Sequence, residues 1–363
     1  IAVISATYWA GMFLGVISGS FLIEAFSWRE TYLVLIPLSI LLLLLAFTGI
    51  HEPRPPLQDP SSRPSLDWTG FISLLAALLL GLAALSVGDD GGSGQLPRIL
   101  FSAGAVAAGF IFLREELRTS RPLVDLRLAR QRVVLILILI GSLTILTFML
   151  LLQEMPFLIR SESGLGLTAG FVGLVLMPGT LCDMLAGPLT GRMVVSRGIR
   201  LPCLIGSLMM VISSLILLFW MHSLLMITLA WMIFSGGMSV TATACMIAII
   251  DYVPLSRTAE ATGLMQSVQT VGGMVGPVLT GLVMAGQTAD GAAGGISGVM
   301  PHAGAFVQIH LLAFFVCLLV LSASLLLLWR IRDPVPALPH HGEEIRTVPH
   351  PGNREDKEWD GKR

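Results

Sequence analysis

The chain carries little charge of either sign. Asp, Glu, Lys and Arg make up 12% of its 363 residues, and the formal net charge is −1. A soluble domain is about one quarter charged, so the composition argues against an ordinary soluble protein. No run of Lys and Arg is available to contact phosphates, so we expect no nucleic acid among its partners.

Motifs for catalysis and cofactor binding are missing too. The four cysteines (Cys182, Cys203, Cys245 and Cys317) lie in apolar runs without C-x-x-C spacing. That arrangement is typical of small core residues rather than of metal ligands or disulfides. The sequence has no G-x-x-x-x-G-K-[ST] loop for ATP, no nucleophile elbow and no His, Cys and carboxylate cluster with metal-ligand spacing. We therefore expect no metal, no cofactor and no enzymatic activity.

The first residues do not resemble a signal peptide. Residue 1 is Ile, and it already lies in an apolar stretch that has neither a basic flank nor a small-residue cleavage site. We interpret the sequence as a fragment that has lost upstream helices.

Long uncharged runs are what the chain has in place of charge. Residues 31–50, 68–88 and 133–153 carry none, and residues 201–250 are uncharged with a polar break at 221–223. About 20 apolar residues cross a bilayer, and within lipid only helices and closed barrels satisfy their own backbone. Runs of this length are too long for barrel strands. The predicted fold is all-α, a polytopic membrane helical bundle with about ten transmembrane helices.

The basic residues give this bundle an orientation. We expect spans at residues 2–25, 31–50, 67–88, 98–114, 132–153, 167–192, 200–220, 224–249, 260–286 and 306–330. All but three of the 22 Lys and Arg, the exceptions being Arg29, Arg98 and Arg160, then lie on one side. Since basic residues favour the cytoplasmic side, the chain is expected to be a multi-pass protein of the cell (inner) membrane with a cytoplasmic C-terminus.

Three segments between or after the spans are polar. Residues 51–66 are proline-rich and are predicted to be a cytoplasmic linker. Residues 115–131 are predicted to be a charged amphipathic segment on the cytoplasmic surface. Residues 331–363, rich in charge and proline, are expected to form a disordered cytoplasmic tail.

Two helices carry small residues at every fourth position. The stripes are Gly11, Gly15 and Gly19 in the first helix and Gly272, Gly276 and Thr280 in the ninth. The ninth helix also carries Pro277 and Gly281 next to its stripe. Such stripes let a neighbouring helix approach closely. Generic helix packing explains one stripe. Two matching stripes favour corresponding helices in two related halves, as in many secondary transporters.

Some polar residues lie in the spans, where an ionisable group costs about 2.5–3.5 kcal/mol. Asp183, five residues after Pro178, is the clearest candidate for proton coupling if it faces a water-filled cavity; the alternative is a structural carboxylate. Glu154 and Gln153 could lie at an outer cavity mouth, although an interfacial position is favoured for Glu154. Gln266 and Gln269 either line the pore or bond across helices.

Other residues near the helix ends have simpler interpretations. Glu24 is expected to be structural or interfacial, and His310 to be a packing or interface residue. Trp220, Trp231 and Trp329 are expected in the interfacial belts.

Several motifs together resemble the major facilitator superfamily, and in particular its fourteen-helix drug:proton antiporter branch. The run from Gly187 to Arg200, GPLTGRMVVSRGIR, is similar to the superfamily's cytoplasmic loop motif. The matching positions are Gly187, Leu189, Gly191, Arg192, Arg197, Gly198 and Arg200. Residues 121–128, residues 151–153 and Ala169-Gly170 with Pro178 resemble passages of the antiporter branch. The stretch from Gly15 to Ser20 departs from that branch's glycine-proline motif, since it lacks the proline and the second glycine.

The resemblance implies a domain plan and a function. Residues 1–50 would be the last two helices of an N-terminal half, residues 67–114 two additional central helices, and residues 132–330 a C-terminal six-helix half. The arginines of the loop motif would form a cytoplasmic latch. The protein would export drugs or amphipathic compounds in exchange for protons by alternating access.

The sequence leaves some alternatives open. An exporter or importer of one metabolite fits the same pattern. A membrane enzyme acting on lipid-linked substrates is disfavoured, because residues 51–66 and 286–304 hold neither paired carboxylates nor a metal cluster. The expected partners are a small-molecule substrate, protons and the lipid bilayer, with any periplasmic or adaptor partner unknown.

Overall fold

A computed structural model of the protein describes residues 2–26, 28–49, 68–86, 95–118, 131–254, 257–286 and 302–330. Its helices are α1 (Ala2–Ala25), α2 (Trp28–Gly49), α3 (Trp68–Ser86), α4 (Gln95–Arg118), α6 (Arg132–Arg160), α7 (Ala169–Arg197), α8 (Arg200–Phe219), α9 (Leu224–Tyr252), α10 (Thr258–Gly286) and α11 (Ala303–Arg330). Within these described ranges the chain is all-α with ten helices, which confirms the predicted fold class.

The length and composition of the helices suit a membrane. Eight of the described helices are long and apolar enough to cross one, whereas α1 and α3 offer shorter apolar stretches, Gly11–Ala25 and Trp68–Ala84. α2 in particular suits a lipid environment, because none of the residues in its most apolar stretch is buried against the described part of the protein. Apolar side chains on every face of a helix are stable only in lipid or against further apolar partners.

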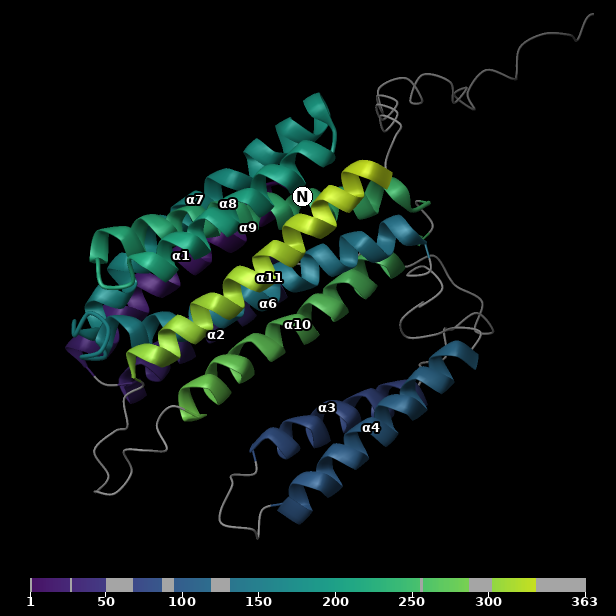
Figure 1. Cartoon of the computed structure of the whole chain (residues 1–363), viewed down its shortest axis with the longest axis horizontal. Helices are drawn as coiled ribbons and strands as arrows, with labels where there is room; N and C mark the ends of the chain where they lie inside the picture. Colours follow the sequence, from purple (N-terminus) through teal and green to yellow (C-terminus); the bar gives the residue numbers. More distant parts are fainter. Residues whose placement is uncertain are drawn as a thin grey trace, which may run out of the picture. The chain divides into compact units, whose positions relative to one another are not determined.

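The C-terminal helices pack around α6. In Figure 1, α6 runs alongside α10 and α11, and it also contacts α9. The remaining close pairs are α8 with α9, α7 with α9, α8 with α11 and α1 with α7. α3 and α4 pack against each other. Assignment of these elements to two halves and a central insertion stays a prediction.

The expected position of Trp231 at the interface is wrong. Its side chain is 2% exposed and lies in the core, stacked on Phe148 and Phe234 with ring centroids 5.9 and 6.0 Å apart. α9 is covered by α6, α7 and α8, so a large ring fills space between helices at this position. Trp220 and Trp329 are 54% and 64% exposed, in keeping with an interfacial location.

Several helices continue past their predicted ends, α6 and α7 by the most residues. α6 ends at Arg160 rather than near 153, and α7 ends at Arg197 rather than near 192. Arg192 and Arg197 therefore belong to a helix, and the predicted loop from 193 to 199 shrinks to Gly198 and Ile199. α7 stops at Gly198 because its φ of 75° and ψ of 175° form a conformation that only glycine adopts readily.

Parts of the predicted domain plan fall outside the described residues. These are the linker 51–66, residues 119–130 of the predicted amphipathic segment, which include the motif at 121–128, and the tail 331–363. Residues 115–118 of that segment are the last turn of α4.

Candidate functional site

Asp183 lies in the contact between α7 and α9. Its side chain is 1% exposed, so it does not face a water-filled cavity in this structure. The hydroxyl group of Ser239 on α9 donates a hydrogen bond to the backbone carbonyl of Asp183 over 3.2 Å. That bond links the two helices through the backbone of Asp183 and does not involve its carboxylate.

A column of polar atoms without hydrogen bonds runs along the same contact. Among the described residues, Asp183 Oδ1, Ser235 Oγ and Trp231 Nε1 are buried and have no hydrogen-bond partner. Ser235 and Trp231 both approach α7 at Gly179, one turn before Asp183, where a Cβ atom would lie 2.4 Å from the indole ring and 2.9 Å from Ser235 Oγ. A buried carboxylate oxygen without a partner is costly as an anion.

An open hollow lies elsewhere, on a helix surface. It measures about 770 Å³ and follows one face of α4 from Arg98 to Phe110. A single helix lines it, so it has none of the convergent polar groups of a ligand site.

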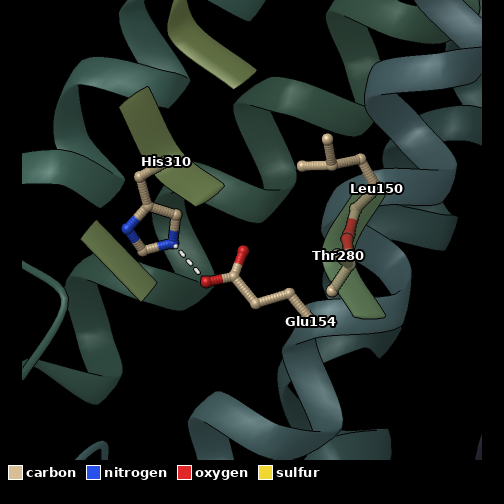
Figure 2. A network of polar contacts seen from close by, with 4 residues as sticks. All are labelled: Leu150, Glu154, Thr280 and His310. Atoms are coloured by element: carbon tan, nitrogen blue, oxygen red, sulfur yellow. Dashed lines mark hydrogen bonds and ion pairs between the residues drawn. The ribbon is translucent and has the colours of Figure 1, made fainter. Parts of the chain in front are cut away.

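The interfacial position favoured for Glu154 is wrong. Its side chain is 0% exposed, and it faces His310 of α11, which is also 0% exposed. Glu154 Oε1 and His310 Nε2 are 3.2 Å apart, and Figure 2 shows the two side chains pointing toward each other. This pairing could not be predicted from the sequence, because the two residues are far apart in the chain and only the packing of α11 on α6 brings them together. The one signal in the sequence was that His310, like Glu154, is an ionisable residue inside an apolar run.

The glutamine candidates divide between buried and exposed positions. Gln269 is buried, with its amide nitrogen 2.5 Å from where a Cβ atom would stand on Gly141 of α6, so it packs across helices. Gln266 is exposed. Gln153 is exposed although its neighbour Glu154 is buried, since successive helical residues point about 100° apart.

The glycine stripe on α10 lies directly against α6. A Cβ atom on Gly272 would stand 2.7 Å from the Ser142 carbonyl oxygen, and one on Gly276 would stand 2.6 Å from the Leu146 carbonyl oxygen. Thr280 completes the stripe by donating a hydrogen bond to the Leu150 carbonyl over 2.9 Å. Pro277 lies inside α10 without ending it, and Gly281 has open space around it.

The stripe on α1 meets no helix in the described part of the chain, so close approach of a helix there stays a prediction. No described atom lies within 4 Å of a Cβ atom placed on Gly11, Gly15 or Gly19. The small residues that bring α1 close to a neighbour are instead on α7, at Gly170 and Gly173.

The α1–α7 contact uses a different face of α1. A Cβ atom on Gly173 would stand 2.6 Å from Ser20 Oγ and 3.3 Å from the Val16 carbonyl oxygen. One turn further along α1, Glu24 accepts a hydrogen bond from the hydroxyl of Thr168 over 3.0 Å, next to the first turn of α7. Glu24 is thus a structural residue, as expected. Thr168 and Gly173 were missed, because neither belongs to a repeated pattern.

The motif near the end of α7 is largely helical. Among the described residues, no atom of another element lies within 4 Å of a Cβ position on Gly187 or Gly191, and Arg192 and Arg197 are exposed. Arg200 begins α8, and Pro178 is inside α7. A latch formed by these arginines remains a prediction.

The sequence profile of the Major Facilitator Superfamily matches residues 1–277 and, in a second match, residues 163–353. The chain belongs to this superfamily. The resemblance of the motifs to this superfamily is thereby confirmed.

Several curated members of the superfamily are similar to this chain. Multidrug resistance protein Stp of Mycobacterium tuberculosis is 27% identical over 271 residues, which are 74% of this chain and 49% of Stp. Multidrug efflux pump LfrA of Mycolicibacterium smegmatis is 25% identical over 288 residues, 78% of this chain and 55% of LfrA. Methyl viologen resistance protein SmvA of Salmonella typhimurium is 29% identical over 197 residues, 53% of this chain and 37% of SmvA. The chain spans about half the length of the first two relatives.

Proposed function

We propose that this protein is a secondary active transporter that exports drugs or other amphipathic compounds in exchange for protons by alternating access. We also propose that it resides in the cell (inner) membrane with its C-terminus in the cytoplasm. The relatives named for multidrug resistance and efflux support the substrate class, and the one-sided distribution of basic residues supports the orientation.

The observation that carries the proton-coupled part is Asp183. It is a buried carboxylate with one oxygen unpartnered, on the contact between two helices of the C-terminal six. In this closed contact Asp183 holds a proton. When α7 and α9 separate and water enters, the carboxylate releases that proton and can attract a cationic substrate.

Asp183→Asn tests this role. The protein is purified in the form that its source cell produces and is reconstituted into liposomes with an imposed pH gradient. Efflux of ethidium, a cationic amphipathic compound, is then measured. We expect the variant to lose pH-gradient-driven efflux while ethidium binding persists, because the amide keeps the shape but cannot ionise. Asp251→Asn, at the far end of α9, is the matched control and should transport normally. Efflux by Asp183→Asn equal to that of the parent at every pH would show that Asp183 is structural.

The orientation has its own test. In a cysteine-free background, Ser196→Cys near the end of α7 and His222→Cys in the turn between α8 and α9 are both exposed positions. A membrane-impermeant thiol reagent added outside intact cells is expected to label His222→Cys and to leave Ser196→Cys unlabelled. Labelling of both from outside would overturn the orientation.

A further inference from the structure

Glu154 and His310 form an isolated buried pair inside the C-terminal helices. Their facing atoms are 3.2 Å apart, and both side chains are 0% exposed. No atom of either side chain makes a well-aligned hydrogen bond within the described residues. Glu154 is six residues from the end of α6 and His310 seven from the start of α11. The pair therefore lies about 10 Å inside these helix ends at the helical rise of 1.5 Å per residue.

Helices packed against the pair bring no other charge to this depth. Within the described part of these helices, the charged residues of α8, α9 and α10 lie near the helix ends farthest from the pair, at Arg200, Asp251 and Glu260. Apart from the pair itself, α6 and α11 carry charge only at their terminal residues, Arg132, Arg160 and Arg330. On α7, Asp183 is about 12 Å deeper along the helices, and Arg192 and Arg197 lie beyond it. The remaining titratable groups near the same helix ends are exposed, namely Glu24, Glu162, His222 and His302. The buried thiol of Cys317 is two turns further along α11.

The backbone that carries Glu154 is held in place by α10. Thr280 donates its hydrogen bond to the carbonyl of Leu150, one turn before Glu154, as Figure 2 shows. Two residues after Glu154, Pro156 has no N–H group to donate within the helix. The glycine stripe of α10 thus positions the turn of α6 that bears the carboxylate.

We propose that Glu154 and His310 together form one proton-binding site, and that a single shared proton keeps the pair neutral and α6 packed on α11. Binding takes one proton from water and changes the net charge of the pair from −1 to zero, whether the proton resides on Oε1 or on Nε2. Without it, a carboxylate beside a neutral imidazole would carry an uncompensated charge among apolar side chains.

The site adds a second proton-binding position to the transport cycle, and this role rests on the proposed function. Loss of the proton stabilises any conformation in which water reaches the pair, because only water or a cation then compensates the carboxylate. Proton binding and close packing of α6 on α11 are therefore coupled. The site is distinct from Asp183, which lies in the α7–α9 contact rather than between α6 and α11.

Infrared difference spectra of the purified protein, recorded across pH, test the site independently of transport. The band of the Glu154 carboxyl group is assigned by its loss in Glu154→Gln. The pH at which this band reaches half of its change is the titration midpoint of the carboxyl group. In His310→Gln we expect that midpoint to move by about one pH unit or more, because coupled groups titrate as a pair. The exposed Glu162→Gln is the matched control and should leave the midpoint in place. The reversed pair, Glu154→His with His310→Glu, keeps both groups and should restore a shared titration if a single variant misfolds.

Transport supplies the second arm. In liposomes, Glu154→Gln is expected to lose pH-gradient-driven ethidium efflux while exchange of ethidium without a gradient continues. If the parent protein moves no ethidium at all, the proposed function fails, and the infrared titration still decides whether the pair exists. An unchanged carboxyl midpoint in His310→Gln, or pH-driven efflux by Glu154→Gln equal to that of the parent, would overturn the shared site.

Discussion

α1 and α10 carry small residues at the same spacing, yet their surroundings differ completely. On α10, a Cβ atom at Gly272 or Gly276 would collide with the backbone of α6. On α1, the same positions open onto space with no described neighbour, and the helix contacts α7 through Val16, Ser20 and Glu24 instead. A stripe of small residues shows which face of a helix can accept close packing. It does not show which neighbouring helix packs there, or whether any does.

The largest effect is expected from Gly276→Leu. Its side chain would begin 2.6 Å from the Leu146 carbonyl oxygen and 2.7 Å from the Leu150 nitrogen, and backbone atoms cannot rotate away. α6 and α10 must separate, so we expect a loss of about 3 kcal/mol in the free energy of unfolding, measured by thermal unfolding in detergent. Gly281→Leu on the same helix has open space and should be near neutral. Similar melting of the two variants would show that the α10 stripe is not a packing surface.

Gly173→Leu should have an intermediate effect. Its nearest contacts are Ser20 Oγ, at 2.6 Å, Ser20 Cβ, at 2.7 Å, and the Val16 carbonyl oxygen, at 3.3 Å. A rotamer change moves Ser20 Oγ away but leaves its Cβ atom in place, so α1 must shift slightly. We expect about 2 kcal/mol of destabilisation of the α1–α7 contact. Crosslinking between cysteines introduced on α1 and α7 would report the separation. Full crosslinking efficiency in the variant would contradict the close approach.

Thr280→Val removes one interhelical hydrogen bond while keeping the shape of the side chain. The Leu150 carbonyl loses its bond from α10, and such bonds in membranes contribute about 0.6–1 kcal/mol. A lowered melting temperature that Thr280→Ser reverses would support the role of the hydroxyl. If Thr280→Ser melts no higher than Thr280→Val, the hydroxyl contributes nothing.

The smallest effect is expected from Gly15→Leu. With no described atom within 4 Å, the change in unfolding free energy should stay within about 0.5 kcal/mol. The measurement is the same thermal unfolding used for Gly276→Leu. A loss as large as on α10 would mean that a partner covers the α1 stripe, and the contrast between the two helices would disappear.

Much of the fold could be predicted from the sequence, because helix count follows from the length of uncharged runs. The ends of helices were harder. α6 continues through Glu154 and Pro156 to Arg160, since a proline inside a helix removes one hydrogen bond without ending it when neighbouring helices support the turn. α7 likewise continues to Arg197, because nothing before Gly198 interrupts it.

The candidate site was predicted only as a set of residue types. Asp183 and Glu154 stood out as carboxylates in apolar runs, but Glu154 was misplaced at the interface, because its closeness to the end of the uncharged run at 153 suggested the membrane surface. His310 gave no local signal of a partner. Its role depends on α11 packing on α6, a contact between residues 156 positions apart in the chain.

The sequence by itself determined that this is a helical membrane protein of about ten spans, and it predicts that most basic residues lie on one side. Hydrophobic length and charge distribution are properties of the chain, and the bilayer acts on them directly. Only the tertiary structure decided which polar groups are buried, which of the two glycine stripes is covered and that Glu154 meets His310. Those outcomes depend on which face of each helix a neighbour covers, and the helical period places adjacent residues such as Gln153 and Glu154 on different faces.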